Sequence, residues 1–291
     1  PGDRVFARRD VLEAAGRGGE PWAASGLERA TSLLVGPEVF ARSSGPRDPT
    51  SQVEALEAAV SALDTTTFGG LVTAPIEKLA CQRAGFGFPG HTEYLATSSG
   101  VDSFAMCLVG PTLRVALVTI HVPLREVADR VSTVGVAAVG RLLGAALQRW
   151  FGVASPRVGV LGLNPHAGEG GMLGVEDAET IAPAVEELSR WGSGRNIVFE
   201  GPLPADTAFP RHQAGDFDGV VAMYHDQGLG PFKLAHFHDG VNLTLGLPYV
   251  RTSPDHGTAF DIAGTGLANP SSMIAAIDLA RSLASRAGYA D

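Results

Sequence analysis

The feature that most constrains the fold is an alternation of short apolar runs with helical patterns along most of the chain. Runs of strand length lie at residues 71–73, 104–109, 115–120, 158–163, 197–199, 220–224 and 241–245. Apolar residues at helical spacing occur between many of them, at 124–130, 134–150, 177–190 and 271–286. This alternation predicts an α/β fold with helices on both faces of a sheet. A hairpin-like turn at 110–112 separates two of the runs, so we expect the sheet to be mixed.

Two helix starts carry capping signals. Ser51 and Glu54 have the spacing of a capping box ahead of an apolar helical pattern. Asn269 and Pro270 are placed as the N-cap and the first residue of the last helix.

Charge and cysteine usage exclude several classes of protein. The net charge is −9, from 22 basic and 31 acidic residues, and no basic run offsets it, so we expect no nucleic-acid partner. No apolar run approaches the roughly 18 residues of a membrane span, and no signal-like segment opens the chain. Cys81 and Cys107 form no CxxC pair, which indicates neither a disulfide framework nor a thiolate metal site. We therefore expect a cytoplasmic protein without a membrane or nucleic-acid partner.

Three of the predicted strands are each followed by a histidine. RVALVTI ends at His121, RVGVLGLNP at His166 and DGVVAMY at His225. Because ligands of open α/β sheets bind at the carboxyl ends of strands, these imidazoles can converge on one point. Neutral imidazoles are good ligands for borderline divalent ions, so the pattern predicts a metal site with open positions. The alternative for each histidine alone is a hydrogen-bonded residue at a strand end.

The loops around these histidines are polar or rich in glycine. NPHAGEGG contains Asn164, Glu169 and several glycines, which allow the backbone to approach a ligand closely. In HDQG, Asp226 follows His225 and either orients that imidazole or caps a helix.

A second group of residues suits an anion. Gly90, His91 and Thr92 lie where a loop enters a helix, a place where backbone N–H groups bind phosphate; a plain helix cap by Thr92 is the alternative. Lys233 and Arg251 are cations in apolar surroundings, and such a charge is costly unless it meets an anion or a structural salt bridge. Asn242 lies between them in the sequence.

The C-terminal segment carries the clearest resemblance to a known family. DHGTAFDIAGTGLANP at 255–270 resembles the adenosine-binding loop of isocitrate and isopropylmalate dehydrogenases. Together with TAPIEK, GHTEY, LNPHAGEGG, GPLPADT, MYHDQG, GVNLTLGLP and RTSPDHGTA, this segment resembles the 4-hydroxythreonine-4-phosphate dehydrogenase family of pyridoxal-phosphate biosynthesis. The resemblance runs from about residue 70 to the end of the chain.

The resemblance implies a role for each matching residue. The metal ligands would be His121, His166 and His225, with zinc, cobalt or magnesium as the ion. The substrate-binding residues would be His91, Thr92, Lys233, Asn242 and Arg251. NAD (or NADP) would bind at His256, Gly257, Thr258, Asp261 and Asn269. Our candidates for catalytic residues are Asp206, as the base that takes the hydroxyl proton, and Lys233.

The resemblance also implies an architecture and an assembly. We expect a two-domain α/β/α fold like that of isocitrate dehydrogenase, with a nucleotide-binding domain at 1–88 and 240–291. Residues 89–239 would form the domain that binds the metal and makes a homodimer with a shared active site. His225 is our candidate for the histidine supplied by the partner, because an apolar segment follows it. The family's first strand and TPGDPAGIGPE-like segment have no counterpart here, since Pro1-Gly2-Asp3 runs directly into RVFARRDVLEAAG.

The implied reaction oxidises the C3 hydroxyl of 4-phosphohydroxy-L-threonine with NAD, and the 3-oxo acid then decarboxylates to 3-amino-2-oxopropyl phosphate. One alternative is a D-threonate or D-erythronate 4-phosphate dehydrogenase of sugar-acid catabolism, whose substrate carries a hydroxyl at C2. A relative that acts on an aromatic cis-diol is disfavoured, because His91-Thr92, Lys233 and Arg251 suit a phosphate. From another class, the chain would be an impaired homologue that binds metal and phosphate without turnover.

Overall fold

One mixed sheet forms the centre of the molecule. The computed structural model describes residues 49–63, 69–262, 265 and 267–288. The sheet has eight strands in the order β1-β8-β7-β2-β3-β6-β4-β5. Their bounds are Gly70–Val72 (β1), Ala105–Val109 (β2), Arg114–Leu117 (β3), Arg157–Leu161 (β4), Val198–Leu203 (β5), Gly219–Ala222 (β6), Val241–Leu245 (β7) and Val250–Pro254 (β8). The predicted α/β class with a mixed sheet is confirmed.

The directions of the strands decide which loops meet. β3, β6, β4 and β5 are parallel neighbours, whereas β2 is antiparallel to both β3 and β7, and β7 is antiparallel to β8. β7 therefore runs in the same direction as β3, β6 and β4. The carboxyl ends of these four strands consequently face the same edge of the sheet.

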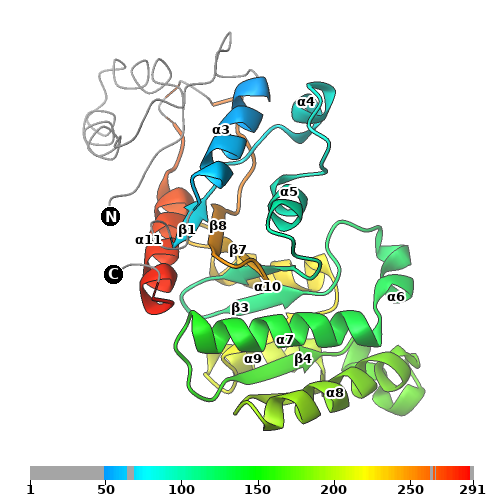
Figure 1. Ribbon diagram of the computed structural model, residues 1–291. Helices are drawn as coiled ribbons and strands as arrows, with labels where there is room; N and C mark the ends of the chain where they lie inside the picture. Colours follow the sequence, from blue (N-terminus) through cyan, green and yellow to red (C-terminus); the bar gives the residue numbers. More distant parts are fainter. Residues whose placement is uncertain (1–48, 64–68, 263–264, 266, 289–291) are drawn as a thin grey trace.

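Helices cover both faces of the sheet, as the alternation predicted. α7, α8 and α11 pack on one face in the largest core cluster, and α9 and α10 pack on the other, behind α7 in Figure 1. These helices span Thr133–Arg149 (α7), Ala182–Ser193 (α8), Ala205–Gln213 (α9), His225–Ala235 (α10) and Ser271–Arg286 (α11). The side chain of Ser132 accepts a hydrogen bond from the backbone N–H of Gly135 and so caps α7.

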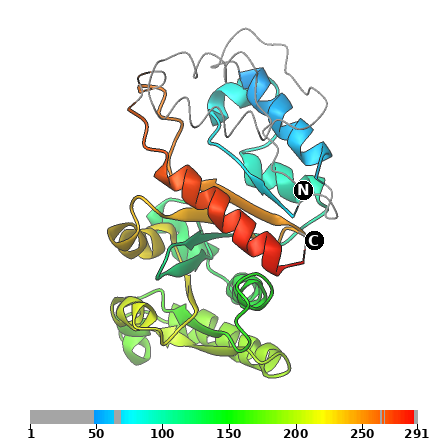
Figure 2. The ribbon, with the colours of Figure 1, turned by 90° about the vertical axis from the view of Figure 1, so that its left-hand side faces the viewer.

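Shorter helical segments flank the sheet edges. A third core cluster, which includes Leu56, Leu95 and Tyr249, joins α3, α5 and the segment before β8 at the β1 end of the sheet, next to α11 in Figure 2. The bounds of the remaining segments are Pro49–Ser61 (α3), Lys78–Arg83 (α4), His91–Ser98 (α5), Leu124–Glu126 (η1), Val127–Arg130 (α6), Pro165–Gly171 (η2) and the π-helical turn Asp177–Ile181 (η3).

The structure departs from the sequence predictions at several elements. All seven predicted runs contribute to strands, and the 110–112 turn joins antiparallel β2 and β3. β8, α4, α9 and α10 had not been predicted. The capping box was wrong, because Ser51 lies inside α3. Pro270 rather than Asn269 is the N-cap of α11, although the side chain of Asn269 still accepts a hydrogen bond from the Ser271 N–H at 3.0 Å.

Two predictions about organisation stay predictions. The proposed boundary between the two domains falls between β7 and β2, which are hydrogen-bonded neighbours in one continuous sheet. The expected lack of an N-terminal strand concerns residues outside the described part of the chain.

No single helix among the described residues is long and apolar enough to cross a membrane. One bent pair, Leu124–Arg130 with Thr133–Arg149, meets that test by length and composition only.

Candidate active site

The three candidate metal ligands follow three adjacent strands. β3, β6 and β4 lie side by side and parallel, and they precede His121, His225 and His166 respectively. The prediction that these histidine-bearing strands end at one edge is therefore confirmed by the topology. The three histidines share this edge because the order of the strands brings together segments that are up to about a hundred residues apart in the sequence.

Two of the three imidazoles lie next to each other. The ring centroids of His121 and His225 are 5.9 Å apart, with 45° between the ring planes. Nδ1 of His225 is 2.7 Å from Oδ1 of Asp226, which fits the predicted orienting role of that carboxylate. Partial burial lowers the pKa of His121, and the charges of Lys78 and His225 lower it further. The lowered pKa of His121 favours its neutral imidazole, the form that binds a metal.

The third histidine stands apart from this pair within one chain. His166 is exposed in η2, where it has a φ of 53° and its neighbours Ala167 and Glu169 also have left-handed φ values. Among the described residues, no group of three or more His, Cys, Asp or Glu side chains is placed to hold a metal ion. The three-histidine site therefore stays a prediction.

Two side chains that the sequence analysis missed hold the histidine-bearing segments in place. Asp177 is only 2% exposed, and its carboxylate accepts hydrogen bonds from the backbone N–H groups of Leu163 and Asn164 at 2.7 and 3.1 Å. It also accepts one from Nδ2 of Asn164 at 2.9 Å. Gln227 accepts a hydrogen bond from the Met223 N–H and donates one to the carbonyl of Gly162, both at 2.7 Å. Gln227 thus ties the start of α10 to the end of β4.

A buried arginine forms the core of the predicted anion site. Arg251, on β8, is 4% exposed. Its guanidinium donates to the hydroxyl oxygens of Thr244 at 3.0 Å and Thr73 at 2.7 Å, while its Nε–H has no partner. No carboxylate among the described residues forms an ion pair with it, so the alternative of a structural salt bridge finds no support there. Burial lowers the pKa of Arg251 to about 10, which leaves the group charged at neutral pH.

Other anion-site candidates surround this arginine. His91 begins α5 after its N-cap Gly90, and Thr92 follows it. Burial, aided by the charges of Arg251 and Lys78, lowers the pKa of His91 to about 3, so its imidazole is neutral. Asn242, on β7, has a buried Oδ1 without a hydrogen-bond partner.

Lys233 differs from Arg251 because it has an acidic partner. Its Nζ lies 2.9 Å from Oδ2 and 3.2 Å from the carbonyl oxygen of Asp255. This ion pair is the structural salt bridge that the sequence analysis left open as the alternative for Lys233. The predicted role of Lys233 in substrate binding and catalysis stays a prediction.

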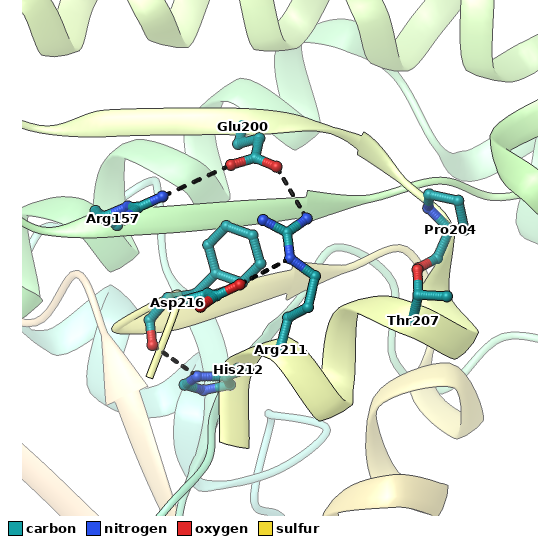
Figure 3. Close-up of polar contacts among 8 residues, drawn as sticks. Arg157, Glu200, Pro204, Thr207, Arg211, His212 and Asp216 are labelled. Atoms are coloured by element: carbon teal, nitrogen blue, oxygen red, sulfur yellow. Dashed lines mark hydrogen bonds and ion pairs between the residues drawn. The ribbon is translucent and has the colours of Figure 1, made fainter. Parts of the chain in front are cut away.

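The candidate base and the nucleotide loop lie on other elements. Asp206 is exposed in the first turn of α9, where its Oδ1 accepts a hydrogen bond from the Thr207 N–H at 3.0 Å; the N-cap of this helix is Pro204. Figure 3 shows how α9 is fixed, with Arg211 3.0 Å from both Glu200 and Asp216. The described nucleotide candidates lie in irregular backbone ahead of α11. They are His256, Gly257, Thr258, Asp261 and Asn269.

Fold and topology together define an α/β protein in which three parallel, histidine-bearing strands end at one edge of a mixed sheet. A family model for the pyridoxal phosphate biosynthetic protein PdxA matches residues 38–280. The chain belongs to the PdxA family, and the resemblance found in the sequence is confirmed.

Individual relatives and solved structures agree with this assignment. The chain is 45% identical to the 4-hydroxythreonine-4-phosphate dehydrogenase of Chromobacterium violaceum over 98% of its own length and 86% of that protein. It is 54% identical to the enzyme of that name from Desulfosudis oleivorans over 72% of its length, but this match spans only 61% of the relative.

Among solved structures, the 4-hydroxythreonine-4-phosphate dehydrogenase of Klebsiella pneumoniae matches with a TM-score of 0.76 and 39% identity, covering 86% of this chain and 76% of that one. A terephthalate 1,2-cis-dihydrodiol dehydrogenase from Burkholderia xenovorans LB400 matches with a TM-score of 0.65 and 28% identity, covering 94% and 92%.

Proposed function

We propose that this chain is a 4-hydroxythreonine-4-phosphate dehydrogenase that depends on NAD and a divalent metal. It would oxidise the C3 hydroxyl of 4-phosphohydroxy-L-threonine, and the resulting 3-oxo acid would lose carbon dioxide to give 3-amino-2-oxopropyl phosphate. Membership of the PdxA family supports the reaction class.

The observation that carries the choice of substrate is the buried guanidinium of Arg251. A buried cation needs an anion or a full set of acceptors, but the five N–H groups of Arg251 find two neutral hydroxyl acceptors, and Nε has no partner. A phosphate ester provides both the negative charge and the acceptor oxygens. Such a site favours a phosphorylated hydroxy acid over an aromatic dihydrodiol, which carries no phosphate.

His121, His166 and His225 would hold the metal. The donor set fits a borderline divalent ion, because neutral imidazoles are its common ligands and Asp226 already orients His225. When bound, the metal supplies Lewis acidity for the hydroxyl and the new carbonyl, and NAD accepts the hydride. Asp206 would take the hydroxyl proton, and the nucleotide would lie against residues 256–261 and Asn269.

We further propose a homodimer with a shared active site. The end of α10 exposes Leu234 (91%), and Phe237 beyond it is 70% exposed, so this segment offers apolar surface to a second subunit. The adjacent rings of His121 and His225 support a site that takes these two histidines from one subunit and His166 from the other.

Complementation between variants tests the sharing of the site. Mixed dimers of His166→Ala with either His121→Ala or His225→Ala subunits should recover activity, since one of their two sites is intact. Mixing His121→Ala with His225→Ala should recover none, because both sites are damaged. If heterodimers form and no pair recovers activity, the shared site is refuted.

A substrate panel tests the function itself. We expect NADH formation from 4-phosphohydroxy-L-threonine, dependent on added zinc, cobalt or magnesium and abolished by His166→Ala with the fold retained. Faster turnover of D-threonate or D-erythronate 4-phosphate would show that this acid, rather than 4-phosphohydroxy-L-threonine, is the substrate. Metal and phosphate binding without turnover of any member would refute dehydrogenase activity.

A further inference from the structure

The predicted phosphate site has too little positive charge if only the residues expected from the sequence are counted. A phosphate ester carries a charge of about −1.5 to −2 at neutral pH. Arg251 supplies one positive charge, and His91 supplies none, because its pKa of about 3 keeps it neutral. Lys233 is already in an ion pair with Asp255. A further cation is therefore needed near Arg251 and His91.

Lysine is rare in this chain. Of the 22 basic residues only two are lysines, Lys78 and Lys233, and all the others are arginines. A lysine ammonium is a compact point charge on a flexible stem, whereas a guanidinium is a planar fork. Because Lys233 is paired with Asp255, Lys78 is the lysine without a carboxylate partner among the described residues.

The structure places Lys78 beside the N-terminus of α5. Lys78 begins α4, six residues after the end of β1, and its side chain extends over Gly90, the N-cap that precedes His91. A Cβ added to Gly90 would lie 3.6 Å from Cε and about 4.0 Å from Nζ of Lys78. The end of the Lys78 side chain therefore lies within van der Waals distance of the Gly90 Cβ position, next to the N-terminus of α5.

Lys78 is exposed, and it forms no ion pair with any other described residue. The carboxylate of Glu93, in the first turn of α5, is also nearby. Its Oε2 lies 3.3 Å from the position that a Cβ on Gly90 would take. The ammonium is near enough to His91 for its charge to act on that imidazole. Arg251 acts on the same imidazole from the buried side. His91 thus lies within the influence of two cations, one buried and one exposed.

We infer that Lys78 is a further substrate-binding residue, whose ammonium supplies the second positive charge for the phosphate held by Arg251, His91 and Thr92. This inference rests on the proposed function, because it takes the bound anion to be the phosphate of the substrate. The buried Arg251 fixes the orientation of the phosphate through its unpaired N–H, and Lys78 closes the site from the solvent side. Thr73, which positions Arg251, directly follows β1, and Lys78 begins α4 at the end of the same loop.

The two lysines allow a direct test. Reductive methylation with ¹³C-formaldehyde keeps the charge and gives dimethyl-lysine NMR signals from Lys78 and Lys233, apart from that of the N-terminal amine. Lys78→Arg assigns the signals. We expect inorganic phosphate to shift the Lys78 signal saturably and to leave the Lys233 signal in place. A shift of the Lys233 signal alone, or of neither signal, would overturn the inference.

Affinity measurements on the full-length protein complete the test. Loss of one charge-assisted contact should weaken phosphate binding to Lys78→Met about tenfold to hundredfold. Lys78→Arg should restore most of the affinity. Arg83→Met, which removes an exposed cation from the same helix, is the matched control and should bind phosphate as the wild type does.

Two further measurements separate the failure of this inference from the failure of the proposed function. If Lys78→Met weakens malonate binding but not phosphate binding, Lys78 binds a carboxylate and the phosphate assignment is overturned. In turnover, Lys78→Met should raise KM far more than it lowers kcat. Phosphate binding needs no turnover, so a wild-type protein that oxidises no phosphorylated acid would refute the proposed function while the phosphate titration still decides the role of Lys78.

Discussion

Replacing Asp177 with alanine would remove the acceptor that holds the backbone ahead of His166. The buried carboxylate accepts three hydrogen bonds, from the Leu163 N–H at 2.7 Å, the Asn164 N–H at 3.1 Å and Asn164 Nδ2 at 2.9 Å. At about 1 kcal/mol net for each bond, the variant should lose about 3 kcal/mol of stability. With about 2–4 °C of melting temperature per kcal/mol in a chain of this size, Tm should fall by about 6–12 °C.

The same change should weaken metal binding. His166 and the residues after it have left-handed φ values that are unfavourable for side chains other than glycine, and the Asp177 contacts lie immediately before this strained turn. Without them the turn can relax and move the imidazole. Loss of such a supporting contact typically costs about 10–100-fold in metal affinity, so we expect a cobalt dissociation constant at least ~10-fold higher.

The measurements are urea unfolding for stability and isothermal titration of the metal-free protein with Co²⁺ for affinity. Asp177→Asn should fall between the wild type and alanine, because it keeps one acceptor but turns an NH₂ group toward two donors. Glu176→Gln is the control, since Glu176 accepts a 2.8 Å bond from the same Asn164 side chain but is half-buried rather than buried. A stability loss below ~1 kcal/mol in Asp177→Ala, or unchanged cobalt affinity, would refute the reasoning.

Two further predictions follow from buried polar contacts. His212, shown in Figure 3, is neutral and held at both nitrogens, with Nδ1 donating to the Phe217 carbonyl and Nε2 accepting from the Arg114 N–H, each at 2.8 Å. Burial lowers its pKa below the ordinary 6.5, so its contribution to stability should be full above pH 6.5 and decline as the pH falls below it. Urea midpoints between pH 8 and 5 check this, and an equally steep decline in His212→Gln would contradict it. Gln227→Met loses both 2.7 Å hydrogen bonds and should weaken Co²⁺ binding about tenfold; Thr252→Val, which loses one buried hydrogen bond elsewhere, should not.

The sequence predicted the strands whose buried residues are mainly apolar and missed β8, whose buried residues are mainly polar. β8 contains Arg251, Thr252 and Ser253, all of them buried, and hydropathy gives no sign of such a strand. These residues are buried because each finds partners from distant segments: Arg251 bonds to Thr73, 178 positions away, and Thr252 donates to the carbonyl of Ala276. Partners of this kind become visible only when the chain is folded.

The candidate site shows the same division between local and tertiary information. Histidines at the ends of strands could be recognised from local pattern, and their common edge follows because β3, β6 and β4 are parallel neighbours. Which cation is free for a ligand could not be predicted, because Lys233 is neutralised by Asp255, 22 positions away, whereas Lys78 reaches over Gly90 only in the folded chain. In the sequence Lys233 is an isolated cation in an apolar stretch, whereas Lys78 directly follows Glu77, so the local argument singled out Lys233 alone. The decisive difference in the folded chain is the ion pair between Lys233 and Asp255, and the NMR signal of dimethylated Lys233, compared between the wild type and Asp255→Asn, tests whether that ion pair persists in solution.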